Sequence, residues 1–236
     1  MMDLPVVVLT SDAYSWALKP FSFLFNLYWS ALQPVIVGTD TRLDFEIPPN
    51  FRVVSMSDWK ALPKEQWSDG LIQLLRSEVG PFFTLLLDDY WISRTVDHQG
   101  ISSLADYMGM HPEVLRMDLT TDRLYAGGMF DVESWGHYDI IETPHGTPYQ
   151  MSLQAGIWNR DRMLEILQPG LTPWQVEVQT SPPETMRVLG TRQIPMRYIN
   201  AFKGGDPGQV LNLEGMPVER VEEMAAAGWF ELREKA

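Results

Sequence analysis

The chain has 236 residues, no cysteine and a formal net charge of −13. This length allows one large domain or two small ones, and a hydrophobic content of 45% indicates a globular protein. The lack of cysteine excludes disulfides, cysteine-based zinc sites and thiol nucleophiles. The charge argues against broad, non-specific nucleic-acid binding, which needs a basic face. The chain shows no signal-peptide pattern and no run of ~20 apolar residues, so we expect a cytoplasmic protein without a transmembrane helix.

The first 90 residues alternate between predicted strands and helices. Short apolar, β-branched runs predict buried strands at 4–9, 34–38, 51–56 and 82–87. Polar residues at helical spacing between Trp16 and Leu32 predict one amphipathic helix, and a second is predicted at 69–78, with Asp69 as its cap. The order β, α, β, β, α, β is typical of a mostly parallel, right-handed α/β sheet.

Beyond residue 90 the pattern is less regular. The segment 120–148 is crowded with Gly, His, Trp and Asp, and we interpret it as an irregular active-site flap or an inserted hairpin. A glycine inside the predicted strand at 150–158, Gly156, indicates a bulge or the close approach of a ligand. The remaining predicted elements are a short helix from 97 to 107, strands at 114–119 and 194–199, and helices at 160–167, from 172 and at 218–229.

Two acids, Asp88 and Asp89, follow the strand at 82–87 directly. Ligands in open α/β sheets bind beyond the carboxyl ends of the strands, so these acids should lie at the mouth of a cleft. Adjacent carboxylates repel each other unless a cation or hydrogen bonds hold them. A divalent metal that carries a diphosphate meets that need. The alternative is that the two acids only cap a helix or form a turn.

Common catalytic and phosphate-binding motifs are absent from the sequence, including G-x-x-x-x-G-K-[ST], G-x-G-x-x-G, G-x-S-x-G and H-E-x-x-H. The four histidines lack metal-ligand spacing, and a surface or structural role is favoured for each. The residues that follow the first strand, 10–14, are placed either to hydrogen-bond a base or ribose or to cap the next helix.

Six short blocks occur in order: LTSDAY at 9–14, FNLYW at 25–29, FTLLLDDY at 83–90, SLQAGIWNRD at 152–161, TPWQVE at 172–177 and RYINAFKG at 197–204. Together they resemble a family of bacterial and phage glycosyltransferases with the GT-A, nucleotide-diphospho-sugar transferase fold. The resemblance implies a single Rossmann-like GT-A domain, with a mostly parallel central sheet flanked by helices. It also implies a nucleotide-sugar half at about residues 1–119 and an acceptor half at about 120–236.

The resemblance assigns roles to individual positions. In such enzymes an Asp-x-Asp signature ends a central strand and holds a divalent metal together with the ribose or diphosphate. Asp88 and Asp89 match that place, although the third position here is Tyr90, and they imply bound Mg²⁺ or Mn²⁺. The strand end that usually meets the nucleobase is matched by Thr10, Asp12 and Tyr14.

Glu177 matches the acid that serves as general base in inverting members. A sugar hydroxyl needs a carboxylate to take its proton, and the neighbouring Trp174 can raise the pKa of that carboxylate by desolvation and stack on a sugar; a solvent-facing helix acid is the alternative. Gln154 and Trp158 fit the acceptor side, although Trp158 equally suits the core. Lys203 could reach the leaving diphosphate or be a plain turn lysine.

The sequence thus predicts an enzyme, a glycosyltransferase that moves a sugar from a nucleotide-diphosphate sugar to an acceptor hydroxyl with the help of a metal. A glycan, a lipid-linked sugar, a protein or a modified nucleic-acid base could be the acceptor, and the acidity of the chain makes DNA the harder case. A sugar nucleotidyltransferase is the first alternative, but it would want a Gly-rich loop with Lys or Arg after the first strand. A non-catalytic carbohydrate-binding or assembly protein suits the aromatic content but not the paired acids.

Overall fold

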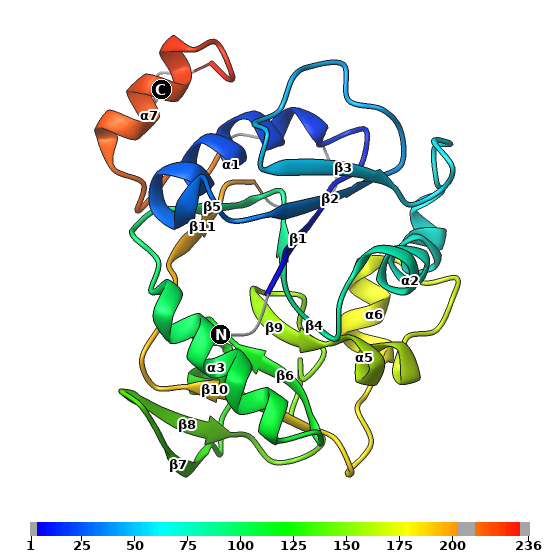
Figure 1. The fold of residues 1–236 in the computed structure, drawn as a ribbon, viewed down its shortest axis with the longest axis vertical. Helices are drawn as coiled ribbons and strands as arrows, with labels where there is room; N and C mark the ends of the chain where they lie inside the picture. Colours follow the sequence, from blue (N-terminus) through cyan, green and yellow to red (C-terminus); the bar gives the residue numbers. More distant parts are fainter. Residues whose placement is uncertain (1–3, 203–210, 232–236) are drawn as a thin grey trace.

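The computed structural model describes residues 4–202 and 211–231, and within them the chain forms a nine-stranded sheet at its centre (Figure 1). The strand order is β3-β2-β1-β4-β9-β6-β10-β8-β7. The pairings set seven strands in one direction and reverse only β8 and β9. The mostly parallel sheet confirms the predicted fold class. The strands are β1 (Val6–Leu9), β2 (Val35–Thr39), β3 (Phe51–Ser55), β4 (Phe82–Leu87), β6 (Val114–Asp118), β7 (Phe130–Trp135), β8 (Tyr138–Glu142), β9 (Gly156–Asn159) and β10 (Arg187–Thr191).

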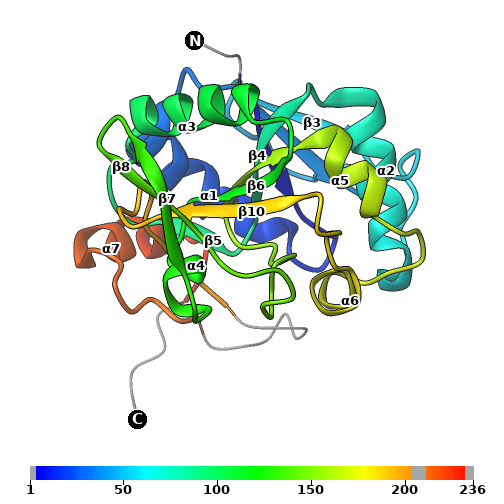
Figure 2. The same ribbon diagram turned by 90° about the horizontal axis from the view of Figure 1, so that it is seen from below.

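Helices cover both faces of the sheet (Figure 2). One core lies beneath α1, α3 and α7, and the other lies beneath α2, α5 and α6. No helix within the described ranges is long and apolar enough to cross a membrane. The helices are α1 (Leu18–Phe25), α2 (Trp67–Glu78), α3 (His98–Met110), α4 (Asp122–Tyr125), α5 (Arg160–Ile166), α6 (Pro173–Gln179) and α7 (Val218–Ala226).

Strand β1 carries no polar residue, because both of its faces are buried. Successive side chains of a strand point to opposite faces of the sheet. Val6 and Val8 therefore pack in the core beneath α1, whereas Val7 and Leu9 pack in the core beneath α2. All four residues are buried, so a polar side chain on either face would lose its hydration.

The aromatic segment that predicts one helix forms three consecutive helical pieces. A 3₁₀ turn at Ser15–Ala17 leads into α1, and a π-helical turn at Asn26–Ser30 follows α1. Pro20 lies in the first turn of α1, where its missing N–H interrupts no helical hydrogen bond. The segment is helical throughout, but its hydrogen-bond pattern changes twice.

Several later elements differ from the prediction. The hairpin of β7 and β8 confirms the inserted hairpin in the segment 120–148. The strand predicted at 150–158 is wrong in its first half, because β9 begins only at Gly156. A short ribbon of β5 (Tyr90–Ile92) and β11 (Tyr198–Asn200) forms a second sheet. Neither β5 nor β10 is predicted from the sequence.

Candidate active site

The polar candidates gather at one edge of the sheet, where its parallel strands end. Thr10 follows β1, Asp40 follows β2 and Asp88 follows β4. Because β9 runs in the opposite direction, the segment 149–155, which precedes it, arrives at the same edge. The two predicted halves of the chain therefore meet where α/β sheets bind their ligands.

Asp88 and Asp89 form the turn between β4 and β5, and their surroundings differ. Asp88 is only 8% exposed, and its carboxylate accepts a hydrogen bond from the Thr10 hydroxyl at 2.5 Å. Burial, and secondly the charge of Asp89, raise the pKa of Asp88 well above its ordinary value. Asp89 is half-buried, and burial raises its pKa to about 7. Its Oδ1 is buried and has no hydrogen-bond partner among the described residues.

The acids fit a divalent metal that arrives with its substrate. Mg²⁺ is commonly held by one or two carboxylates, with water and substrate phosphates completing its coordination. The unpartnered Oδ1 of Asp89 is available for such a bond. Within residues 4–202 and 211–231, no group of three or more acidic or histidine side chains gathers to form a complete protein cage. A metal held here would therefore also need the oxygens of the diphosphate.

The predicted nucleobase residues lie along the loop after β1. Asp12 is exposed and accepts a hydrogen bond from the Thr41 hydroxyl. The neighbouring Asp40 has its pKa raised to about 6, mainly by burial and secondly by the charge of Asp12. Tyr14 stacks on Phe202, with ring centroids 5.3 Å apart. The ends of β1 and β2 thus form one acidic corner of the edge.

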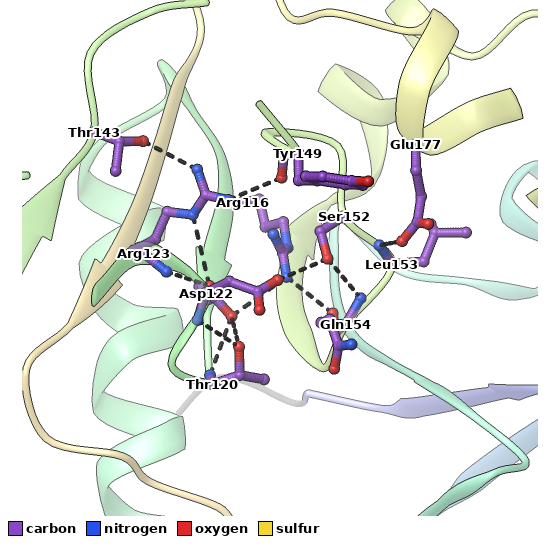
Figure 3. A network of polar contacts seen from close by, with 11 residues as sticks. Arg116, Thr120, Asp122, Arg123, Thr143, Tyr149, Ser152, Leu153, Gln154 and Glu177 are labelled. Carbon is purple, nitrogen blue, oxygen red and sulfur yellow. Dashed lines mark hydrogen bonds and ion pairs between the residues drawn. The ribbon is translucent and has the colours of Figure 1, made fainter. Parts of the chain in front are cut away.

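Helix α4 holds the first part of the segment 149–154 (Figure 3). Arg123 donates a hydrogen bond to the backbone carbonyl of Tyr149 at 2.8 Å. The Ser152 hydroxyl donates to the carboxylate of Asp122 at 2.7 Å. The backbone of this segment pairs with no strand before β9 begins. These bonds, and not a β-ladder, therefore hold it in place.

The second part of the same segment is held by Glu177 and Arg116 (Figure 3). The Leu153 N–H donates to Glu177 Oε1 at 2.7 Å, and Arg116 donates to the Gln154 carbonyl at 3.0 Å. Burial raises the pKa of Glu177, and this effect is opposed by the Leu153 N–H and by the charge of Arg116. A carboxylate with a raised pKa is a better proton acceptor near neutral pH, as a general base requires.

Helix α6 positions Glu177 through its own first turn. The Gln175 N–H donates to the Thr172 hydroxyl at 3.2 Å, and the Thr172 N–H donates to the Gln175 side chain at 2.9 Å. This capping box satisfies two of the free N–H groups at the start of the helix. Pro173 occupies the first helical position, as the sequence predicts.

Two buried arginines share one buried carboxylate beneath this site. Arg116 and Asp118 are 0% exposed and Arg123 is 1% exposed. Asp118 accepts from Arg116 at 3.3 Å and lies 3.7 Å from Nε of Arg123. A Cβ atom at Gly156 would lie 2.9 Å from Nε of Arg116, and one at Gly190 would lie 2.7 Å from Cγ of Arg123. Gly156 therefore makes room for an arginine, and not for a ligand or a bulge.

A cavity of about 480 Å³ lies beside this network, and Gln154 is one of its lining residues. Tyr198 and Asn200 of β11 line it as well. Asn200 pairs with Tyr90, the residue after Asp89, and the rings of Tyr90 and Tyr198 lie 4.6 Å apart. The cavity therefore reaches from Gln154 to the ribbon that continues from the paired acids.

The other predicted acceptor residues have different surroundings. Trp158 is fully buried in the core, with its ring beneath the guanidinium of Arg116 at 5.2 Å, and this supports the core alternative. Trp174 is 55% exposed on α6, three positions before Glu177. The predicted diphosphate ligand Lys203 lies outside the described residues.

The polar residues of the site that sequence reasoning misses include Arg116, Asp122 and Tyr198. Arg116 has a detectable signal, because a charged residue within an otherwise apolar strand must find a buried partner. Asp122 and Tyr198 carry no such signal in the sequence. Their positions depend on the packing of α4 and β11 against the edge.

The strand order and the helices on both faces of the sheet define a Rossmann-like, GT-A-like α/β fold with a mostly parallel central sheet. No protein-family model and no curated protein matches the sequence. Among solved structures, the chain is similar to UDP-glucose pyrophosphorylase from Acinetobacter baumannii, with 12% identity, coverage of 96% of this chain and 94% of that chain, and a TM-score of 0.50. The UTP-bound form of that enzyme gives 9% identity, the same coverage and a TM-score of 0.51.

A weaker likeness is to the glycosyltransferase GlyE of Streptococcus pneumoniae TIGR4. It has 8% identity, covers 70% of this chain and 36% of that chain, and gives a TM-score of 0.38. The likeness to the pyrophosphorylase shows the fold only.

Proposed function

We propose that this protein is a glycosyltransferase that moves a sugar from a nucleotide-diphosphate sugar to an acceptor hydroxyl. The observation that carries the proposal is the joint placement of Asp89 and Glu177 at the carboxyl edge of the sheet. Asp89 offers a free, buried oxygen for a metal–diphosphate group. Glu177 is a desolvated carboxylate within electrostatic range of Tyr90, the residue that follows Asp89.

The charge at the end of β1 favours sugar transfer over nucleotidyl transfer. A nucleotidyltransferase must hold the triphosphate of its incoming nucleotide, which calls for cations or free N–H groups near the first strand. Here residues 10–14 contain no Lys or Arg, and the acids Asp12 and Asp40 lie close together. Such a corner suits the N–H donors of a base or the hydroxyls of a ribose better than it suits a triphosphate.

The chemistry assigned to the chain follows from these positions. Thr10 fixes Asp88, and Asp88 and Asp89 orient the diphosphate of the donor. Mg²⁺ or Mn²⁺ bound with the donor would neutralise charge on the departing diphosphate. Glu177 takes the proton of the acceptor hydroxyl as its oxygen attacks the anomeric carbon, if the reaction inverts the configuration. In a retaining reaction Glu177 would only orient the acceptor.

A panel of nucleotide-diphosphate sugars tests the proposal. We expect hydrolysis or transfer of one donor, with release of the nucleoside diphosphate, and loss of that activity in EDTA. In Asp89→Asn, calorimetry should show loss of metal-dependent UDP binding. Asp44→Asn, which changes an exposed acid in the loop after β2, should retain it. Formation of pyrophosphate from a nucleoside triphosphate and a sugar 1-phosphate would instead identify a nucleotidyltransferase.

A further inference from the structure

Two arginines line the cavity beside the candidate active site. Arg94 lies two residues after β5, and Arg197 lies directly before β11. The backbones of the two strands are joined next to them, because the Ser93 N–H donates to the Arg197 carbonyl at 3.0 Å. Both arginines are exposed, so both can reach a ligand in the cavity.

Neither arginine is engaged by a side chain of the described residues. This is unusual for a chain with 31 acidic and 18 basic residues. Elsewhere in the described part of the chain, only Arg76 is equally unengaged. The other arginines pair with carboxylates or, in one case, stack on a tryptophan: Arg42, Arg52, Arg116, Arg123, Arg160, Arg162, Arg187, Arg192 and Arg220.

The described acids of the same cavity form no ion pair with these arginines. Asp122 accepts the Ser152 hydroxyl and lies beside the buried arginines. Glu214 also lines the cavity, yet it forms no ion pair with Arg94 or Arg197. Both arginines thus line one cavity without an ion pair to any described residue.

We propose that the acceptor carries a phosphate group, which binds between Arg94 and Arg197. This inference rests on the proposed sugar transfer, since it names the class of acceptor. The planar donor fork of arginine matches phosphate oxygens in pairs. Two such forks beside the paired strands β5 and β11 can bind a phosphate dianion in a protein whose overall charge would otherwise repel it.

The geometry favours a single phosphate over a nucleic-acid backbone. Binding along DNA or RNA requires a series of cations that follow the phosphates. The cavity offers two arginines in one hollow, beside Gln154 and Asn200, in a protein of net charge −13. A phosphorylated small acceptor and a lipid with a phosphate headgroup present the same chemistry to this hollow.

Titration with inorganic phosphate tests the inference. UDP and Mg²⁺ are kept at saturation so that the donor site is filled, and the arginine Nε–H resonances are followed by NMR. We expect the double variant R94Q/R197Q to bind phosphate at least about tenfold more weakly than the wild type. The matched control R76Q removes an exposed, unengaged arginine of α2 and should leave phosphate binding unchanged. Equal phosphate affinity in the wild type and the double variant would overturn the inference.

Two further measurements separate the outcomes. Binding of sn-glycerol 3-phosphate, or of phosphatidylcholine vesicles that contain phosphatidic acid, supports the inference when the double variant loses it, and distinguishes a free acceptor from a lipid headgroup. Arginine-dependent binding of a short oligodeoxynucleotide without binding of inorganic phosphate would overturn it. UDP binding is measured in the same variants. If neither UDP nor any other nucleoside diphosphate binds even the wild type, the proposed function fails, whereas retained nucleotide binding with no phosphate effect rejects only the phosphate site.

Discussion

Glu177 combines a fixed position with a carboxylate that gains a proton readily. One oxygen, Oε1, is held by the Leu153 N–H, and burial raises the pKa of the group. A general base needs both properties, because its oxygen must meet the acceptor hydroxyl in one orientation and must bind the proton it removes.

For Glu177→Gln we expect the rate of sugar transfer to fall by roughly 10²–10⁴-fold, the usual contribution of a general base. UDP affinity should stay within a factor of about two, because the change does not alter the acids after β4. Single-turnover transfer and calorimetric UDP binding check the two parts. Glu184→Gln, which changes an exposed glutamate, serves as the control and should alter neither. Full transfer activity in Glu177→Gln would remove the residue from the mechanism.

Replacement of Asp89 should increase the stability of the fold and at the same time abolish function. Its folded-state pKa of about 7 lies above the ordinary value of 3.8, so ionisation of Asp89 favours the unfolded chain. Asp89→Asn should therefore raise the melting temperature at pH 8, and it should have little effect at pH 4, where the acid is mostly protonated in the fold. Thermal unfolding at both pH values checks this, with Asp44→Asn as the control. An unchanged melting temperature at pH 8 would contradict it.

At the scale of elements, the first turn of α6 determines the position of Glu177. The capping box fixes the start of the helix, and Glu177 follows in the next turn. Loosening the cap should therefore affect both the stability of the fold and the chemistry of the site.

We expect Thr172→Ala to lower the free energy of unfolding by about 1 kcal/mol, the typical cost of losing an N-cap. Sugar transfer should fall with it, whereas UDP affinity should persist. Thr172→Ser retains a capping hydroxyl and should restore both properties. Urea unfolding and transfer assays on the two variants give the comparison. Equal transfer rates in them would show that the cap does not position Glu177.

The first strands and helices are predictable from the sequence because local patterning determines them. Strand β4 and its following acids stand out as an apolar run with an abrupt change of polarity, and α6 carries its own start signal. Strand β10 does not stand out, because Arg187 and Gly190 interrupt its apolar character. Both residues have partners distant in the sequence, Glu142 and Arg123.

The segment 150–155 shows the same limit within the site. Its residues alternate like a strand, yet side chains of β6 and α6 bond its backbone, a side chain of α4 bonds the Ser152 hydroxyl, and no ladder forms. Glu177 and the two acids that follow β4 belong to local sequence motifs, so the sequence alone reveals them. The arginines that surround them act through distant contacts, and a one-dimensional pattern contains no record of those contacts.

At the scale of the whole molecule, the buried acids should set the pH dependence of stability. The pKa values of Asp88, Asp89 and Asp40 are all raised, mainly by burial. A raised carboxyl pKa means that the folded protein binds more protons than the unfolded chain above about pH 4, so stability falls as the pH rises through that range. The lowered pKa values of Asp97 and Glu113 act in the opposite sense, but only at pH values below the ordinary carboxyl range.

We therefore expect the melting temperature to be higher at pH 5 than at pH 8. Saturating UDP with Mg²⁺ should reduce the difference, because the bound metal would favour the ionised form of Asp89. Calorimetric scans across this range, with and without the ligand pair, provide the measurement. A melting temperature that rises from pH 5 to pH 8 would show that the buried acids do not dominate.

The two glycines that face the buried arginines constrain how this protein can change over evolution. Any side chain at position 156 would collide with Arg116, and any at 190 would collide with Arg123. A larger residue at either glycine is therefore tolerable only when the facing arginine has already become shorter. Descendants of this chain should show paired substitutions at 156 with 116 and at 190 with 123, and a lineage that altered one member alone would lose the clamp on the loop before β9.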